Sequence, residues 1–157
     1  MLYLGLGIFS VIIIALDQLT KYLTVAYIPL GEAVAAIPGL FHFTYIRNTG
    51  ASFSMLEGRG WLFILMLALF TIVLAVILKK KWITKPFELW CLAAIWAGGI
   101  GNAIDRIRLG YVIDMIEVDF MHFAVFNLAD IFITCGCIAL IVYVLFFTRE
   151  KKEGQTQ

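Results

Sequence analysis

The chain has 157 residues, of which 62% are hydrophobic and only 15% are charged, and its formal net charge is +1. Its mean hydropathy is +0.96. A water-soluble domain of this length needs more polar surface, so the composition excludes an ordinary soluble domain and predicts an integral membrane protein. The near-neutral charge gives no indication of nucleic acid binding, and we expect no nucleic acid partner.

Four segments are long and apolar enough to cross a membrane as helices, because a spanning helix needs about 20 mainly apolar residues. They are approximately residues 4–27, 61–78, 88–107 and 127–147. The first segment carries Asp17 and Lys21 where the apolar core of a cleavable signal peptide would continue, so we expect a retained span. Thr84, Pro86 and Glu88 indicate the start of the third helix.

The distribution of basic residues predicts the orientation, since cytoplasmic loops are enriched in lysine and arginine. One side carries Lys79, Lys80, Lys81, Lys85, Arg149, Lys151 and Lys152, and the other side carries Arg47, Arg59, Arg106 and Arg108. Seven basic residues against four place both termini in the cytoplasm. The polar stretch between the third and fourth spans then faces outward.

The connection between the first two spans contains a predicted strand. Phe41, Phe43, Tyr45 and Arg47 alternate with other residues, which indicates a strand with one aromatic face. We expect a small extracytoplasmic β-cradle over residues 37–55, lying at the headgroup level of the membrane. The charged tail from about residue 149 is expected to be frayed. The predicted fold class is therefore a membrane all-α protein with four transmembrane helices and this cradle, forming a single domain over residues 1–157.

The stretch from 98 to 130 concentrates polarity between two apolar segments. It holds four aspartates, one glutamate, two arginines and two asparagines. Acid groups at the edge of the hydrocarbon are expensive and are usually functional. The spacing does not choose among Asp114, Glu117 and Asp119, and a solvated outer loop is the alternative interpretation for all three.

Two further groups of polar residues fit structural roles on their spacing alone. Asp17 and Lys21 are four residues apart and can pair on one helix face; alternatively, Lys21 supplies positive charge to a site. Asn102 and Asp105 share a helix face, and Arg106 can reach Asn102 one turn back. We interpret these three residues as a polar network that joins helix ends.

At the start of the fourth span, Asn127 is a favourable N-cap, and Asp130 suits the positive end of the helix dipole. The same position would hold one carboxylate rigidly at the boundary between water and lipid. A second carboxylate nearby would force one of the two to keep its proton. Such a pair offers a base to activate water and an acid to protonate a leaving amide nitrogen.

Other hydrolytic arrangements have less support. The sequence has no H-E-x-x-H motif, and His42 and His122 are too few and too scattered for a zinc site, so no metal is expected. Ser52 and Ser54 lack the closing glycine of a nucleophile elbow. The three cysteines lie in apolar runs without the usual zinc spacing.

Five motifs together resemble a known family. D-Q-L-T-K contains Asp17 and Lys21, R-N-T-G-A-S-F contains Asn48, Gly50 and Phe53, G-N-A-I-D-R contains Asn102, Asp105 and Arg106, V-I-D contains Asp114, and F-N-L-A-D contains Asn127 and Asp130. The chain resembles the lipoprotein signal peptidases (signal peptidase II), the bacterial membrane aspartyl peptidases. The resemblance covers nearly the whole chain.

The resemblance implies that Asp114 and Asp130 are the catalytic dyad, and that Glu117 and Asp119 are not catalytic. The residues implied to line or brace the site are Asp17, Lys21, Asn48, Gly50, Asn102, Asp105, Arg106 and Asn127. The implied reaction is removal of the signal peptide from a diacylglyceryl-modified prolipoprotein, just before the lipidated cysteine, with no cofactor. The implied location is the bacterial cytoplasmic membrane, with membrane lipid around a monomer and the active site near the outer face.

Two rival functions remain for comparison. A small ion- or proton-coupled transporter could use Asp17, Lys21 and Asp130 as a relay, but it predicts ionisable groups throughout the membrane and an internal repeat. A purely structural membrane protein would leave the cluster of asparagines and aspartates unexplained.

Overall fold

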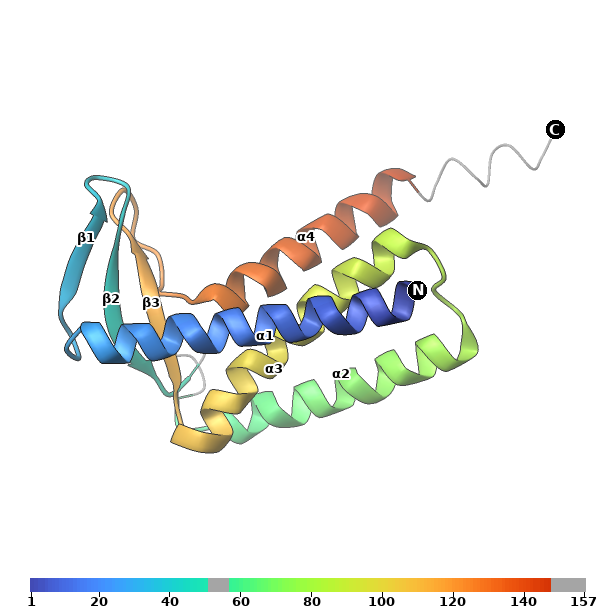
Figure 1. Ribbon diagram of the computed structural model, residues 1–157, viewed down its shortest axis with the longest axis horizontal. Helices are drawn as coiled ribbons and strands as arrows, with labels where there is room; N and C mark the ends of the chain where they lie inside the picture. The colour runs from blue at the N-terminus through green and yellow to red at the C-terminus, as the bar shows by residue number, and fades with distance from the viewer. Residues whose placement is uncertain (51–56, 148–157) are drawn as a thin grey trace.

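The architecture is four long helices with a three-stranded antiparallel sheet at one end (Figure 1). The computed structural model describes residues 1–50 and 57–147. In chain order the elements are α1 (Leu2–Tyr27), β1 (Ala33–Ile37), β2 (Phe41–Asn48), α2 (Gly60–Lys80), α3 (Pro86–Leu109), β3 (Val112–Val118) and α4 (Leu128–Phe147). The N-terminus lies at the end of the bundle opposite the sheet.

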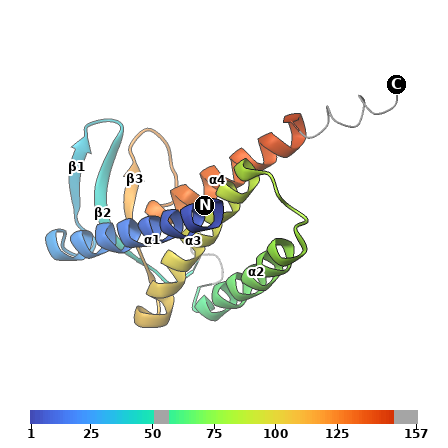
Figure 2. The same ribbon diagram turned by 45° about the vertical axis from the view of Figure 1, so that its right-hand side comes forward.

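All four helices are long and apolar enough to cross a membrane, which confirms the four predicted spans. The fold class is therefore a four-helix membrane protein with a small β-sheet. Helix α2 has the highest mean hydropathy, 3.0, and contains no buried residue. It packs mainly against α3 and stands apart from α1 and α4 (Figure 2). A helix that is apolar all round and unburied by protein is suited to lipid on most of its surface.

Helix α3 is the most buried of the four and packs against α1, α2 and α4. It begins at Pro86, as predicted, because proline is favoured in the first turn. It ends at Leu109, and the capping residue Gly110 has a φ of 81°, which glycine adopts without strain. Small residues let its neighbours approach. A Cβ added at Gly98 would lie 2.5 Å from the backbone oxygen of Ala129 on α4. Close contact of α3 with α4 therefore depends on the absence of a side chain at this position.

The sheet contains a strand from outside the predicted cradle. Its order is β1-β2-β3, and β3 comes from the connection between α3 and α4 rather than from residues 37–55. The interpretation of Asp114 and Glu117 as members of a solvated loop was therefore wrong. The segment V-I-D-M-I-E-V is rich in β-branched residues and pairs with β2, so that Ile46 lies opposite Asp114.

The predicted aromatic face of β2 was also wrong. A bulge lies between Phe43 and Ile46, and it interrupts the alternation of side chains. Tyr45 is consequently buried in a small core with Ile113 and Met115, whereas Phe43 is 40% exposed. The predicted tail from residue 149 and the last part of the predicted cradle lie outside the described residues.

Candidate active site

The site begins with a buried cluster of charges between α1 and α3. Lys21 is 1% exposed, and its ammonium lies 2.9 Å from the Asp17 carboxylate and 3.0 Å from the Asp105 carboxylate. It also donates a hydrogen bond of 2.9 Å to the Asn102 side-chain oxygen. The predicted pair of Asp17 and Lys21 is confirmed, and it belongs to a larger network. The ion pairs of Lys21 with the two carboxylates offset the desolvation cost of burying these charges.

The two carboxylates of this cluster also bind backbone groups. The Ala129 N–H in the first turn of α4 donates to Asp17 at 3.0 Å, and the Ile113 N–H in β3 donates to Asp105 at 3.2 Å. The charge cluster thus fixes the start of α4 and the start of β3 relative to α1 and α3. These two elements carry the remaining carboxylates of the site.

Gln18 is a member of the cluster that the sequence did not indicate. Its side-chain amide donates to Asp105 at 3.0 Å, to the Gly101 backbone oxygen at 3.2 Å and to Asp17 at 3.3 Å. A polar residue within an apolar span was the available signal, since such residues usually have buried partners.

Asn102 connects the charge cluster to the first of the two remaining carboxylates. Its side-chain oxygen accepts from Lys21 and, at 3.0 Å, from the Asn127 amide. Its own amide donates to Asp130 at 2.8 Å. Because Lys21 occupies the oxygen, Asn102 is oriented with its NH₂ group toward Asp130.

The start of α4 holds Asp130 by a reciprocal cap. The Asp130 N–H donates to the Asn127 side-chain oxygen at 3.0 Å, and the Asn127 N–H donates to the Asp130 carboxylate at 3.1 Å. The predicted N-cap role of Asn127 is confirmed, and the return bond completes a capping box. The cap leaves the Asn127 amide free to reach Asp114, to which it donates at 2.6 Å. Asn127 therefore contacts both carboxylates.

Asp114 enters the site from β3 and is 2% exposed. The Asn48 amide of β2 donates to its second carboxylate oxygen at 2.8 Å. Burial raises the pKa of Asp114 to about 6; the hydrogen bonds from Asn48 and Asn127 oppose this shift, and the nearby charge of Asp130 adds to it. This carboxyl therefore exchanges its proton at a pH closer to neutrality than an ordinary aspartate.

Arg106 and Gly50 close the side of the site toward α2. The guanidinium donates to the Gly50 backbone oxygen at 2.9 Å and to the Asn102 backbone oxygen at 3.5 Å. Its central carbon lies 4.4 Å from the centre of the Phe63 ring, in cation–π geometry. The Gly50 N–H in turn donates to the Asn48 side-chain oxygen at 2.9 Å, so Asn48 is oriented with its amide toward Asp114. Phe63 is a second residue that the sequence did not single out.

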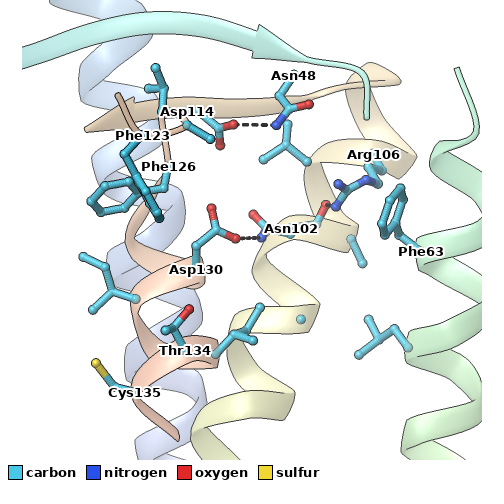
Figure 3. Close-up of a pocket in the computed structure, with 18 residues that line it drawn as sticks. Asn48, Phe63, Asn102, Arg106, Asp114, Phe123, Phe126, Asp130, Thr134 and Cys135 are labelled. Atoms are coloured by element: carbon cyan, nitrogen blue, oxygen red, sulfur yellow. Dashed lines mark hydrogen bonds between the residues drawn. The ribbon is translucent and has the colours of Figure 1, made fainter. Parts of the chain in front are cut away.

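The two carboxylates open into one cavity of about 560 Å³ between the sheet and helices α2, α3 and α4. We call it the inner cavity. Figure 3 shows Asp114 reaching it from β3 and Asp130 from α4, with both carboxyl groups directed into the same space. Its polar lining consists of Asn48, Asn102, Arg106, Asp114, Asp130 and Thr134. Its apolar lining includes Phe63, Leu67, Ile131 and Ile133, so the cavity has both polar and apolar walls.

The structure therefore brings together all ten residues that the sequence assigned to the site. Glu117 and Asp119 lie elsewhere, where they bind the two ring nitrogens of His42 at 3.0 and 2.6 Å. Phe53, Ser52 and Ser54 lie outside the described residues. Within residues 1–50 and 57–147, no group of three or more histidines, cysteines, aspartates or glutamates has the arrangement of a metal site.

The fold and the site define a multi-pass membrane protein with paired carboxylates in a partly apolar cavity at one end of its helices. The model of the family described as Signal peptidase (SPase) II matches residues 9–146. The chain belongs to the signal peptidase II family, and it is therefore a membrane peptidase.

Individual relatives agree with this membership. The lipoprotein signal peptidase of Enterococcus faecalis (strain ATCC 700802 / V583) is 41% identical over 146 residues, which cover 93% of this chain and 91% of the relative. That of Streptococcus agalactiae serotype Ia is 44% identical over 136 residues, 86% of this chain and 88% of the relative. Two bacterial membrane enzyme structures determined by the in meso method superpose with TM-scores of 0.88 and 0.82, at 30% and 29% identity. The first match covers 95% of this chain and 92% of the solved chain, and the second covers 90% of this chain and 93% of the solved chain. Family membership favours the peptidase over the transporter alternative.

Proposed function

We propose that this protein removes the signal peptide from diacylglyceryl-modified prolipoproteins and cleaves just before the lipidated cysteine. The single observation that carries the proposal is the pair of carboxylates, Asp114 and Asp130, which share one cavity at the end of the membrane-spanning helices. Both accept hydrogen bonds from Asn127, whose backbone N–H donates to Asp130 and whose side-chain amide donates to Asp114. The relatives named lipoprotein signal peptidase support the substrate class.

The chemistry follows from two carboxyl groups that differ in protonation. An ionised carboxylate takes a proton from a water molecule, whose oxygen attacks the carbonyl carbon of the scissile peptide bond. The second carboxyl, still protonated, gives its proton to the amide nitrogen as the carbon–nitrogen bond breaks. The signal peptide leaves with a new carboxylate, and the lipidated cysteine leaves with a free amino group. The raised pKa of Asp114 supports a proton-exchanging role.

The surrounding residues keep the two carboxylates in place during this exchange. Asn48, Asn102 and Asn127 donate to the carboxylates from three different elements. Lys21 orients Asn102 and supplies a positive charge behind it. Rigid positioning matters because reacting groups displaced by about 1 Å can lose on the order of a hundredfold in rate. We therefore assign these residues to positioning rather than to proton transfer.

The apolar part of the inner cavity suits the lipidated side of the substrate. Acyl chains and the apolar signal segment would remain among α2, α3 and α4, while the scissile bond reaches the carboxylates at the polar end. Cleavage at the membrane boundary requires this division, because acyl chains are stable only in apolar surroundings.

The test uses purified Asp114→Asn and Asp130→Asn in detergent with a diacylglyceryl-modified prolipoprotein. Each variant is expected to lose cleavage by at least about a hundredfold, since removal of a positioned acid or base costs 10²–10⁴. Glu117→Gln is the matched control, because it removes a carboxylate from the same strand outside the cavity, and it should keep most activity. Mass spectrometry of the wild-type product should show a lipidated N-terminal cysteine. Near-normal cleavage by either aspartate variant, with the fold intact, would refute the dyad.

We also propose that both termini lie in the cytoplasm and that the site lies near the outer face of the bacterial cytoplasmic membrane. The experiment starts from a chain without cysteines. Met121→Cys, beside the sheet, should react with a membrane-impermeant maleimide in intact cells. Trp82→Cys, between α2 and α3, should react only after lysis. The opposite pattern would reverse the orientation.

A further inference from the structure

A second cavity, of about 390 Å³, adjoins the inner cavity, with which it shares Asp114, Asn48 and residues 123–125. We call it the outer cavity. Its walls are the end of β2 and the following residues, Glu57, and the chain that leads to α4: Ile46, Arg47, Asn48, Thr49, Glu57, Asp114, His122, Phe123, Ala124 and Val125. Asp130 lines the inner cavity and does not line this one. Asp114 therefore stands at the junction of two cavities.

The two cavities differ in chemical character. The surface of the inner cavity is mostly apolar, whereas the surface of the outer cavity is about equally polar and apolar. It is bordered by the Glu57 carboxylate, the His122 imidazole and the Arg47 guanidinium. Such walls suit a polar peptide and not an acyl chain.

Two of these charges have contacts that define their positions. The Arg47 Nε donates to the Tyr45 hydroxyl at 3.0 Å, and its guanidinium lies 5.0 Å from the centre of the Tyr111 ring. The partners of Arg47 are neutral, so its charge is not cancelled by them. The Glu57 carboxylate accepts a hydrogen bond of 3.2 Å from the neutral Thr49 hydroxyl.

A lipidated prolipoprotein has the same division as the two cavities. The signal segment and acyl chains on one side of the scissile bond are apolar, and the mature chain on the other side is polar and must leave toward water. We infer that the outer cavity is the subsite for the first residues of the mature lipoprotein that follow the lipidated cysteine, with Glu57 setting their charge preference. This inference rests on the proposed function.

The test compares three lipidated substrates that differ only at the residue after the cysteine, which is Lys, Ser or Glu. Opposite charges in a partly exposed site change affinity by a few-fold, so Glu57→Lys should lower the Lys-to-Glu ratio of kcat/KM by about fivefold or more relative to wild type. Glu32→Lys is the matched control, since Glu32 is exposed beside β1 and lines neither cavity. It should leave the ratio unchanged. An identical ratio in wild type and Glu57→Lys would overturn the subsite, although cleavage itself continues.

A second measurement does not depend on turnover. A benzophenone at the residue after the cysteine is photolysed on the inactive Asp130→Asn protein, whose change lies outside the outer cavity, and the crosslinks are mapped by mass spectrometry. Crosslinks to Ile46, Arg47, Thr49 or His122, which line the outer cavity and not the inner one, are expected. Crosslinks only to Leu67 or Ile133, in the inner cavity, would overturn the inference. Failure of the wild-type protein to cleave even the serine substrate would instead refute the proposed function, so the two failures are distinguishable.

Discussion

Substitution of Gly98 by alanine should damage the site from a position that does not line the inner cavity. The new Cβ would lie 2.5 Å from the Ala129 backbone oxygen and 2.8 Å from a side-chain carbon of Ile133. The Ala129 oxygen belongs to the backbone and cannot rotate away as the end of a flexible side chain could. Helix α4 must therefore move away from α3 by about half an ångström or more. This displacement would occur one residue before Asp130 and would stretch its hydrogen bond from Asn102.

The magnitude follows from overpacking. Forcing an extra methyl group into a packed contact costs about 1–3 kcal/mol. Gly7→Ala is the matched control, because Gly7 is also helical and has nothing within 4 Å of the added Cβ. The gain of about 0.5–1 kcal/mol from replacing a helical glycine is common to both variants and cancels in their difference.

The assay measures the free energy of unfolding in detergent and the rate of prolipoprotein cleavage for wild type, Gly98→Ala and Gly7→Ala. Gly98→Ala should be less stable than Gly7→Ala by about 1–3 kcal/mol. It should also cleave about tenfold to a hundredfold more slowly, because the carboxylate on α4 is displaced. If Gly98→Ala matches Gly7→Ala in both measurements, close packing of α3 on α4 does not position Asp130.

Three further outcomes are expected. Because the folded-state pKa of Asp114 is raised from 3.8 to about 6, the folded protein binds this proton more tightly than the unfolded chain, and stability should fall as pH rises between these values. Relative to Asp114→Asn, the wild type should lose up to about 3 kcal/mol in unfolding free energy between pH 4 and pH 7; parallel pH profiles would contradict this. The pKa of His42 is raised, chiefly by its hydrogen bond to Asp119 and further by Glu117. The charged imidazole therefore stabilises the fold at low pH, and this stabilisation is lost as the pH rises through the raised pKa. Amide exchange in β2 and β3, corrected for intrinsic rates, should therefore accelerate with pH in the wild type but not in His42→Gln, and equal pH dependence would count against the contact. Lys21→Met leaves two buried carboxylates without their cation and should cost about 3–5 kcal/mol in unfolding free energy, and a cost below about 1 kcal/mol would show that the cluster is not tightly coupled.

Local features were predictable because they depend on neighbours along the chain. The four spans follow from runs of apolar residues, and their bounds shifted by only a few residues. The pairing of Asp17 with Lys21 follows from four-residue spacing on a helix, and the capping role of Asn127 follows from its place before an apolar run. Each of these needs one helix and no tertiary partner.

The choice among the three acids after α3 was not local. Spacing left Asp114, Glu117 and Asp119 equivalent as loop residues, and only the resemblance to a family distinguished them. In a strand, residues three apart point to opposite faces, so the pairing of β3 with β2 directs Asp114 toward Asn48 and leaves Glu117 beside His42. That pairing joins residues more than sixty positions apart, and no local pattern specifies it.

The sequence by itself determined a four-span membrane chain and the residue types available for acid–base chemistry. The tertiary structure decided which of those residues meet, because Asn102, Asn127 and Asp114 come from three elements and converge only when α3, α4 and β3 pack together. A run of apolar residues can be recognised within each segment alone. Contact between distant polar groups depends on how the segments pack, and Gly98 permits the close approach of α3 and α4.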